Sequence, residues 1–403
     1  MTSSLPRQQR RFLQPLHSPK HRRITASFPA ELLQDFFGGA DDTAHQPLEH
    51  SKKKPQEPEG SPTPVASQVS DETLVVHAGE KMGNGTKAGA REYGRYGNPT
   101  VKVLEDKISS LERAEATLVT SSGMNAIVAT LLALIPPGGH IVTTTECYSE
   151  ARAFIRDRMG KMGIRSTFID IDENMKLSLK DVLAKNDVTL FYADSPTNPM
   201  LKCLDISLVA ELCHQKGALV CIDSTLAPPI NQKPLTLGAD VVLHSATKYM
   251  AGHHDVIAGC VSGSEALISK VRAWHHDIGG AISPNAAYMI IRGLKTMALR
   301  VEAQNRTALL MACVLERHPL IERVKSDLRG TMRFIDALDI PFIATSLGGC
   351  ESLVQQPGVM SFWGQSGEEK AKNGIKDNLV RFSFGIERFE DLRDDILQAL
   401  DKI

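Results

Sequence analysis

The stretch that decides the fold is residues 239–252, which read Ala-Asp-Val-Val-Leu-His-Ser-Ala-Thr-Lys-Tyr-Met-Ala-Gly. The apolar run in its first half predicts a strand, and Ser245, Thr247 and Lys248 follow where that strand ends. A lysine with hydroxyls at i−3 and i−1 suits a Schiff-base lysine, because the hydroxyls can donate to phosphate oxygens while the amine condenses with an aldehyde. Taken by itself, the pattern is more often a surface lysine after a strand.

Similar short apolar runs recur along the chain and alternate with helical segments. Strand candidates lie at residues 117–120, 141–145, 189–193, 219–223 and 241–244, with helices expected at 179–185 and 206–216. Strands buried on both faces and separated by helices predict an α/β fold with a mostly parallel, doubly wound sheet. Such sheets bind ligands at the carboxyl ends of their strands, and Lys248 follows one of these ends.

The last part of the chain predicts a smaller region of different character. A long helical stretch at 284–318 leads to a helix at 331–338, strands at 342–344 and 379–384, and a closing helix from Phe389. This pattern predicts a C-terminal α+β domain at residues 319–403, after a large domain at residues 71–318.

Residues 1–70 have the composition of a targeting segment and a linker. The first thirty residues are basic and contain serines, and no acid precedes Glu31. That composition is typical of organelle transit peptides. The Lys- and Pro-rich residues 40–70 predict a disordered linker, so folded protein is expected to begin near Glu72.

Composition excludes several classes of protein. A formal charge of −1 over 403 residues, without a basic stripe, argues against nucleic-acid binding. The longest apolar runs, such as 126–137, are shorter than the ~20 residues that span a bilayer, so a membrane protein is excluded. The seven cysteines include no C-x-x-C pair, and the histidine pairs at 253–254 and 275–276 match no ligand spacing, so neither a metal site nor a disulfide framework is expected.

Three other strand ends carry residues that suit the same cofactor. Asp223 ends one predicted strand, where a carboxylate can keep a pyridine nitrogen protonated. Ser122, Gly123 and Met124 open a helix whose N–H groups form a phosphate site, and Tyr148 is placed to stack on a planar ring. Each residue also has a commoner structural explanation, as a turn former, a helix cap or a core tyrosine. Four strand ends that suit one cofactor favour a pyridoxal-phosphate site.

Longer motifs resemble a known family. They are residues 92–100 (Glu-Tyr-Gly-Arg-Tyr-Gly-Asn-Pro-Thr), 195–199 (Ser-Pro-Thr-Asn-Pro), 245–249 (Ser-Ala-Thr-Lys-Tyr), 292–296 (Arg-Gly-Leu-Lys-Thr), 346–352 (Ser-Leu-Gly-Gly-Cys-Glu-Ser) and 378–383 (Asn-Leu-Val-Arg-Phe-Ser). On these motifs the chain resembles the Cys/Met-metabolism branch of the pyridoxal-phosphate enzymes over nearly everything from Asp71 to Ile403. It is most similar to the plant members that make cystathionine. The resemblance implies a fold-type-I pyridoxal-phosphate-dependent transferase.

The resemblance implies a set of site residues. Lys248 is implied to bind the cofactor and to shuttle protons, Asp223 to pair with the pyridinium nitrogen, and Tyr148 to stack on the ring and take part in catalysis. The other implied cofactor residues are Gly123, Met124, Asn198, Thr225, Ser245 and Thr247, with Tyr93 and Arg95 reaching the phosphate from the neighbouring subunit. Arg381, as the clamp on the substrate carboxylate, and Ser346 are implied to bind the substrate.

The resemblance also implies a reaction, an assembly and a location. The reaction is a γ-replacement in which cysteine displaces the γ-substituent of an activated homoserine, O-phosphohomoserine in plants, to give cystathionine on the transsulfuration route to methionine. A γ-lyase or β-lyase, or a truncated and catalytically impaired paralogue, remains an alternative. The implied assembly is a homotetramer. The implied location is the chloroplast stroma, or the cytoplasm if residues 1–70 are not a transit peptide.

The sequence departs from the family pattern in two places. Only residues 80–92 separate His77-Ala78-Gly79 from Tyr93, where the family has a longer stretch near the substrate entrance. After Val324 the chain lacks a turn, a helix and a glycine-rich strand of the small domain, and residues 325–330 lead directly into the next helix. A missing strand leaves a sheet edge unpaired, so the small domain is expected to be truncated.

Overall fold

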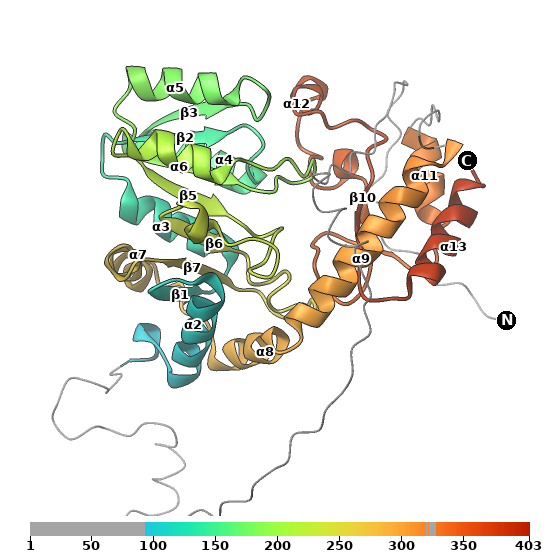
Figure 1. Cartoon of the computed structure of the whole chain (residues 1–403), viewed down its shortest axis with the longest axis horizontal. Coiled ribbons are helices and arrows are strands. Elements are labelled where there is room, and N and C mark those ends of the chain that lie inside the picture. The colour runs from blue at the N-terminus through green and yellow to red at the C-terminus, as the bar shows by residue number, and fades with distance from the viewer. Residues whose placement is uncertain (1–92, 320, 322–327) are drawn as a thin grey trace, which may run out of the picture. The chain divides into compact units, whose positions relative to one another are not determined.

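Seven strands form the large sheet of the computed structural model, which describes residues 93–319, 321 and 328–403 (Figure 1). The strands are β1 (Ala116–Thr120), β2 (His140–Thr144), β3 (Arg165–Ile169), β4 (Leu190–Asp194), β5 (Leu219–Asp223), β6 (Val241–His244) and β7 (Gly259–Gly263). Their order in the sheet is β1-β7-β6-β5-β4-β2-β3. The strands from β3 to β6 pair in parallel, and only β7 runs antiparallel to its neighbours β1 and β6. The predicted mostly parallel sheet is therefore confirmed.

Several sequence-based expectations fall outside the described residues. The predicted transit peptide and linker at residues 1–70 are among them, and so is the first departure from the family at residues 80–92. The described residues from Gly94 to Ile403 belong to one compact unit. A boundary between a large domain ending at residue 318 and a small domain beginning at residue 319 stays a prediction.

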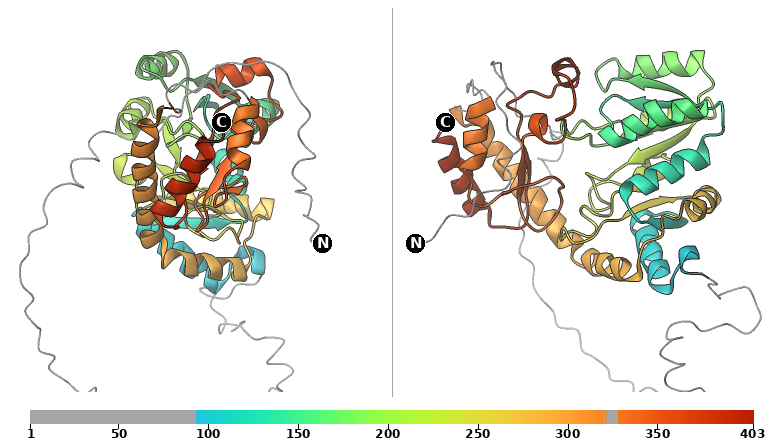
Figure 2. Two further views of the ribbon diagram at one scale, coloured as in Figure 1. Left: turned by 90° about the vertical axis from the view of Figure 1, so that its right-hand side faces the viewer. Right: turned by 180° about the vertical axis from the view of Figure 1, so that it is seen from behind.

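Helices cover both faces of the large sheet (Figure 2). Successive strand side chains point to opposite faces, so neighbours such as Phe191 and Tyr192 on β4 enter different cores. Tyr192 packs with α3 (Gly123–Leu134) and α7 (Glu265–Ile278), whereas Phe191 packs with α5 (Met175–Lys185) and α6 (Ile206–His214). Every residue of β4 is buried. Burial on both faces explains why this strand is apolar along most of its length and not alternating.

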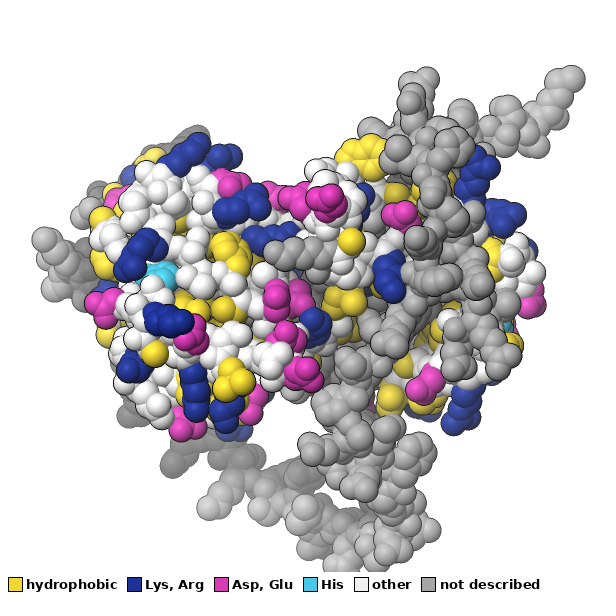
Figure 3. Space-filling model, turned by 90° about the horizontal axis from the view of Figure 1, so that it is seen from above, with side chains coloured by type: hydrophobic (Ala, Val, Ile, Leu, Met, Phe, Trp, Pro, Cys, Tyr) yellow, Lys and Arg dark blue, Asp and Glu magenta, His cyan; other side chains and the backbone are white. Residues whose placement is uncertain are grey.

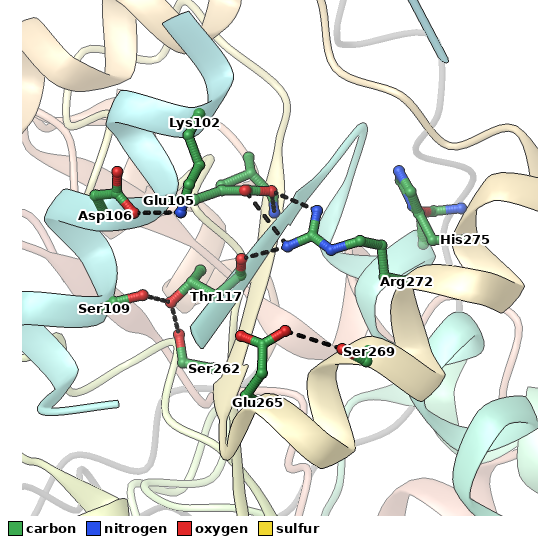
Figure 4. Close-up of polar contacts among 12 residues, drawn as sticks. Lys102, Glu105, Asp106, Ser109, Thr117, Ser262, Glu265, Ser269, Arg272 and His275 are labelled. Carbon is green, nitrogen blue, oxygen red and sulfur yellow. Dashed lines mark hydrogen bonds and ion pairs between the residues drawn. The ribbon is translucent and has the colours of Figure 1, made fainter. Parts of the chain in front are cut away.

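A buried polar cluster ties α2 (Pro99–Glu112) and α7 to β1 (Figure 4). The Arg272 guanidinium lies 3.2 Å from Glu105 Oε1 and also donates to the Thr117 carbonyl at 3.0 Å. Glu105 is 5% exposed, and its Oε1 also accepts from the Val119 N–H at 3.3 Å. A buried carboxylate with these partners fixes the two helices against the edge strand.

A second, smaller sheet contains β8 (Phe342–Ile343), β9 (Leu353–Gln355) and β10 (Arg381–Ser383) in the order β10-β9-β8. β10 is antiparallel to β9, and β8 is parallel to it. Its core side chains, such as Val354 and Phe382, pack with residues of α9 (Met297–Glu316), α11 (Leu328–Asp336) and α13 (Phe389–Leu400). This arrangement is the smaller α+β region that the sequence predicts.

The structure refines several predicted elements. The helical stretch expected at 284–318 is two helices, because α8 (Pro284–Leu294) ends before α9 begins at Met297. The strand expected at 379–384 is shorter, Arg381–Ser383, and β3, β7 and β9 have no predicted counterpart. The remaining short helices are α4 (Ser149–Ala153) and α12 (Gly367–Lys372), with a π-helical turn at Phe154–Met159 and 3-10 turns at Gly94–Tyr96, Gly160–Met162, Pro234–Leu237 and Pro357–Val359.

The surface carries charges of both signs. Figure 3 shows Lys and Arg side chains interspersed with Asp and Glu over one face of the molecule. Among the described residues, no helix has the length and apolar character required to cross a membrane. In the same part of the chain, no group of three His, Cys, Asp or Glu side chains has a geometry that could hold a metal ion.

Candidate active site

The carboxyl ends of β4, β5 and β6 lie side by side and carry polar residues. Asp194 ends β4 and is the register partner of Asp223, which ends β5. Thr225 ties the chain after β5 to the chain after β6: its N–H donates to Asp223 Oδ1 at 2.9 Å, and its hydroxyl accepts from the Ser245 N–H at 2.7 Å. The sheet therefore brings Asp223 and Thr225 next to the segment that leads to Lys248.

Lys248 is held at the junction of the two sheets. Its Nζ donates to Ser346 Oγ at 3.0 Å, a contact between residues 98 positions apart in the chain. Burial lowers the pKa of the Lys248 amine, and the nearby positive charge of Arg381 lowers it further. Both effects favour the neutral amine, which is the form that attacks a carbonyl carbon.

Arg381, on β10, is anchored by one residue from the loop after β4 and one from the loop after β8. Its Nη1 donates to Asn198 Oδ1 at 2.9 Å, and its Nη2 donates to the Ser346 carbonyl at 2.7 Å. Burial lowers the pKa of its guanidinium to about 10, so the group stays charged at neutral pH. Arg381 therefore presents a fixed positive charge within reach of Lys248 and Asn198.

The N-terminus of α3 packs directly against Ser245. Ser122 caps this helix and accepts from the Asn125 N–H at 3.0 Å, and Gly123 and Met124 are its first two residues. A Cβ added at Gly123 would lie 2.9 Å from the Ser245 Cβ, so only glycine allows this close approach. First-turn N–H groups have no acceptor within their own helix, which makes this corner suited to a phosphate.

Thr247 and Tyr148 are tied to the backbone around the same corner. The Thr247 hydroxyl donates to the Ala258 carbonyl and accepts from the Ala258 N–H, each at 3.0 Å. Tyr148 precedes α4, and its N–H donates to Asp194 Oδ2 at 2.9 Å. Tyr148 is 40% exposed, so part of this residue is accessible to a ligand. A phosphate contact from Thr247 stays a prediction.

Tyr93 and Arg95 lie in a different setting from the other predicted site residues. Tyr93 is 59% exposed. Arg95 donates through Nη1 to the His276 carbonyl near the end of α7 at 2.6 Å, and its guanidinium lies 5.0 Å from the centre of the Tyr96 ring. Arg95 thus contacts α7 and its own neighbour in the chain.

Asp194 is a residue of this cluster that the sequence interpretation missed. It is 7% exposed, and its two oxygens accept from the Tyr148 N–H and from the Tyr192 hydroxyl. A signal was present, because Asp194 follows the apolar run 189–193 just as Asp223 closes the run 219–223.

A cavity of about 780 Å³ opens beside the cluster. It is bounded by residues on both sides of Lys248 and by the chain from β8 to β9. The lining residues are Thr247, His254, Asp255, Val256, Ile257, Phe342, Ile343, Ala344, Thr345, Ser346, Glu351 and Leu353. Ser346 lines this cavity and also accepts the hydrogen bond from Lys248. The volume is in the range of small-molecule sites, and the cavity adjoins the reactive amine.

A profile of the family described as "Cys/Met metabolism PLP-dependent enzyme" matches residues 48–326 and 323–401. The chain belongs to this family. It is therefore a pyridoxal-phosphate-dependent enzyme, which confirms the fold, the family and the cofactor that the sequence predicts. The residues present fit the cofactor: Lys248 supplies an amine with a lowered pKa, Asp223 a buried carboxyl, and the start of α3 a corner that a Cβ at Gly123 would fill.

Members of the Cys/Met metabolism family with known names are similar over most of this chain. The chloroplastic cystathionine gamma-synthase 1 of Nicotiana tabacum is 50% identical over 392 residues, covering 83% of this chain and 72% of the tobacco protein. The L-methionine gamma-lyase of Fusobacterium nucleatum subsp. polymorphum is 38% identical over 346 residues, covering 77% and 86%. The crystal structure of cystathionine gamma synthase from Xanthomonas oryzae pv. oryzae, in complex with aminoacrylate and cysteine, matches with a TM-score of 0.74 and 31% identity, covering 80% and 90%.

The comparisons also bear on the second departure from the family pattern. The alignment with the tobacco enzyme is 392 positions long but contains only 83% of the 403 residues of this chain. Some positions of the tobacco enzyme therefore have no counterpart here. The family profile matches in two pieces that meet at residues 323–326. That meeting point falls where the sequence lacks the segment expected after Val324.

Proposed function

We propose that this enzyme joins cysteine to an activated homoserine, O-phosphohomoserine, by γ-replacement and so makes cystathionine for methionine biosynthesis. The observation that carries the proposal is the 50% identity to the tobacco cystathionine gamma-synthase, against 38% to the methionine gamma-lyase. Lys248, Asp223 and Arg381 support it, because all three are present around one cluster.

Each residue of the cluster has a task in this reaction. Bound pyridoxal phosphate supplies an electron sink for the pair of electrons left when a proton leaves the substrate. Lys248 Nζ accepts and returns that proton, and Ser346 Oγ holds the amine in position. Arg381 binds the substrate carboxylate, and Asn198 orients the guanidinium for it. Orientation of this kind is worth large factors in rate.

The remaining assignments concern the cofactor. The N–H groups of Gly123 and Met124, together with Ser245 and Thr247, are proposed to bind the phosphate, with Thr225 holding the Ser245 backbone. Tyr148 is proposed to cover the ring and Asp223 to pair with its nitrogen. Asn198 is also proposed to lie near the phenolic oxygen.

The same proposal includes an assembly and a location. Tyr93 and Arg95 are proposed to complete the phosphate site of a neighbouring subunit, within a homotetramer. Residues 1–70 are proposed to direct the chain to the chloroplast stroma as a transit peptide and linker, since the tobacco relative is named as chloroplastic. Without that signal the enzyme would stay in the cytoplasm.

The deciding experiment measures which product the purified protein makes. Protein saturated with pyridoxal phosphate is incubated with cysteine and O-phosphohomoserine, and cystathionine and 2-oxo acid are quantified in the same sample. Cystathionine as the main product supports the proposal. Release of 2-oxo acid from cystathionine or methionine, without net synthesis, would identify a lyase.

A truncated and impaired paralogue is the second candidate, and the two-piece profile match at residues 323–326 favours it. Arg381 lies in the small sheet, so a loosely held clamp would slow turnover more than it weakens cofactor binding. Insertion of the family's missing segment after Val324 would then raise turnover by roughly an order of magnitude at unchanged cofactor affinity. Turnover that the insertion leaves unchanged would show that the segment is dispensable.

A further inference from the structure

Asp194 and Asp223 form a pair of buried carboxyl groups on adjacent strands. They face each other in the register of β4 and β5, and they are 7% and 8% exposed. The Tyr192 hydroxyl, also from β4, donates to Asp194 Oδ1 at 3.2 Å. Tyr192 is fully buried, and a hydrogen bond from its hydroxyl also lowers the pKa of Asp223. The site therefore holds twice the carboxyl groups that one pyridinium nitrogen needs.

Two buried carboxyl groups at paired positions of adjacent strands do not both ionise readily, because each charge raises the free-energy cost of ionising the other. Burial raises the pKa of both residues, and the contacts that oppose this effect differ. For Asp223 the opposing contacts are the Thr225 N–H, which donates to it at 2.9 Å, and the His244 ring. Burial raises the pKa of Asp194 well above its ordinary value, and the charge of Asp223 raises it further.

The other titratable groups around Asp194 supply no positive charge. Burial raises the pKa of the Cys147 thiol to about 12 and the pKa of the Cys221 thiol well above its ordinary value, so both thiols are neutral. The Tyr192 hydroxyl is neutral for the same reason. Tyr148 contributes its backbone N–H, and its hydroxyl pKa is also raised by burial. Among the described residues, the groups that act on Asp194 are Asp223, the Tyr148 N–H and the Tyr192 hydroxyl, and none of them is a cation.

We propose that Asp194 is a protonated positioning residue of the cofactor site. Through Oδ2 it fixes the backbone of Tyr148, and through the Tyr192 hydroxyl it shares one proton with Asp223 so that only Asp223 is charged. When Asp194 is ionised, the Tyr192 hydroxyl donates to its Oδ1. When Asp194 is protonated, its own O–H donates across the same contact, and the Tyr192 hydroxyl then donates to Asp223. The inference rests on the proposed role of Asp223 as partner of the pyridinium nitrogen.

The test compares Asp194→Asn with Asp223→Asn in the protein loaded with pyridoxal phosphate. An asparagine at 194 imitates a protonated carboxyl: its oxygen accepts from the Tyr148 N–H and its amide donates to the Tyr192 oxygen. Asp194→Asn is therefore expected to keep cofactor affinity and turnover within about threefold, while Asp223→Asn lowers turnover by about 10²-fold or more. The matched control is Asp187→Asn, which removes an exposed carboxylate just before β4.

The thermal stability of the same proteins at different pH reports the proton directly. Asp194 is ionised in the unfolded chain above pH about 4 but protonated in the folded protein, so unfolding releases a proton. The parent protein should lose stability relative to Asp194→Asn as pH rises from 5 to 6, by up to about tenfold in the unfolding equilibrium. Asp187→Asn should show no such trend. A purely structural role for Asp194 would give a constant difference between parent and variant.

Each outcome separates the two proposals. Unchanged turnover in Asp223→Asn removes Asp223 from the proposed mechanism. If Asp223→Asn is impaired and Asp194→Asn is equally impaired, or does not fold, a neutral group is not accepted at 194 and the shared proton is refuted. A flat stability difference between pH 5 and 6 refutes it as well.

Discussion

The large sheet and the small sheet contribute to one site in different ways. β4 and β5 are buried almost throughout and end in Asp194 and Asp223, so their strand ends are fixed by the core beneath them. β8, β9 and β10 have two or three residues each, and β10 carries Arg381. The positions of Arg381 and Ser346 depend on hydrogen bonds that cross to Asn198 and Lys248. In the proposed function, cofactor binding would thus depend on the core of the large sheet, and substrate orientation on contacts between the two sheets.

The largest effect is expected at Lys248, which joins the large-sheet side of the site to Ser346 on the small-sheet side. Lys248→Ala should lower turnover by at least about 10³-fold, since it removes both the amine that binds the cofactor and the proton carrier. Borohydride should no longer attach the cofactor to the protein, while the folded structure is kept. The control is Lys295→Ala, an exposed residue after α8. Cofactor trapped on another lysine of the variant would show that the assignment is wrong.

The core under the large sheet contains a buried pair whose loss should be expensive. His244 Nε2 lies 2.6 Å from Glu112 Oε1, and the two side chains are 2% and 0% exposed. His244→Ala should lower the free energy of unfolding by about 3 kcal/mol, because it leaves Glu112 buried without that partner. Urea unfolding of the cofactor-loaded protein measures the change.

The matched control for this pair is His214→Ala. His214 lies 2.8 Å from Asp240, but the side chains are 45% and 23% exposed. A partly exposed pair contributes about 1 kcal/mol or less, so the control should change stability little. If both variants lose the same free energy of unfolding, burial of the His244–Glu112 pair does not explain the larger loss expected at His244.

The small sheet is tested at Arg381. Arg381→Lys keeps the charge but loses the planar fork that reaches Asn198 and the Ser346 carbonyl together. We expect kcat/KM to fall by about tenfold to a hundredfold, with cofactor affinity unchanged within about twofold. Arg388→Lys, an exposed arginine just before α13, is the control. A parallel loss of cofactor affinity in Arg381→Lys would remove the distinction between the two sheets.

The large sheet could be predicted from the sequence because its signals are local. The apolar runs ending at Asp223 and His244 mark strands buried on both faces, and the polar residues after them mark the site. β7 could not be predicted because it begins and ends with glycine, at Gly259 and Gly263, and glycine is more typical of turns than of strands. β3 was missed because Arg165 and its neighbours leave it partly exposed at a sheet edge.

The contacts between the sheets could not be predicted in the same way. Arg381 and Asn198 lie 183 positions apart, and nothing in either motif states that the guanidinium meets that amide. Asp194 and Asp223 meet because of sheet register, which depends on how β4 and β5 are placed by the whole core. Such contacts follow from topology, so pattern reasoning named most of the residues but not their partners.

The smallest expected effect lies in the electrostatic coupling between the sheets. In the apoprotein, burial lowers the pKa of the Lys248 amine below its ordinary value of 10.5, and Arg381 lowers it further. The neutral amine that captures pyridoxal phosphate is therefore populated at lower pH than for an exposed lysine, and the capture rate should rise with pH and level off below 10.5. Arg381→Met removes the positive charge, so the midpoint of that rise should move to higher pH. Arg388→Met should leave it in place, and coincident midpoints for Arg381→Met and the parent would show that burial alone sets the Lys248 pKa.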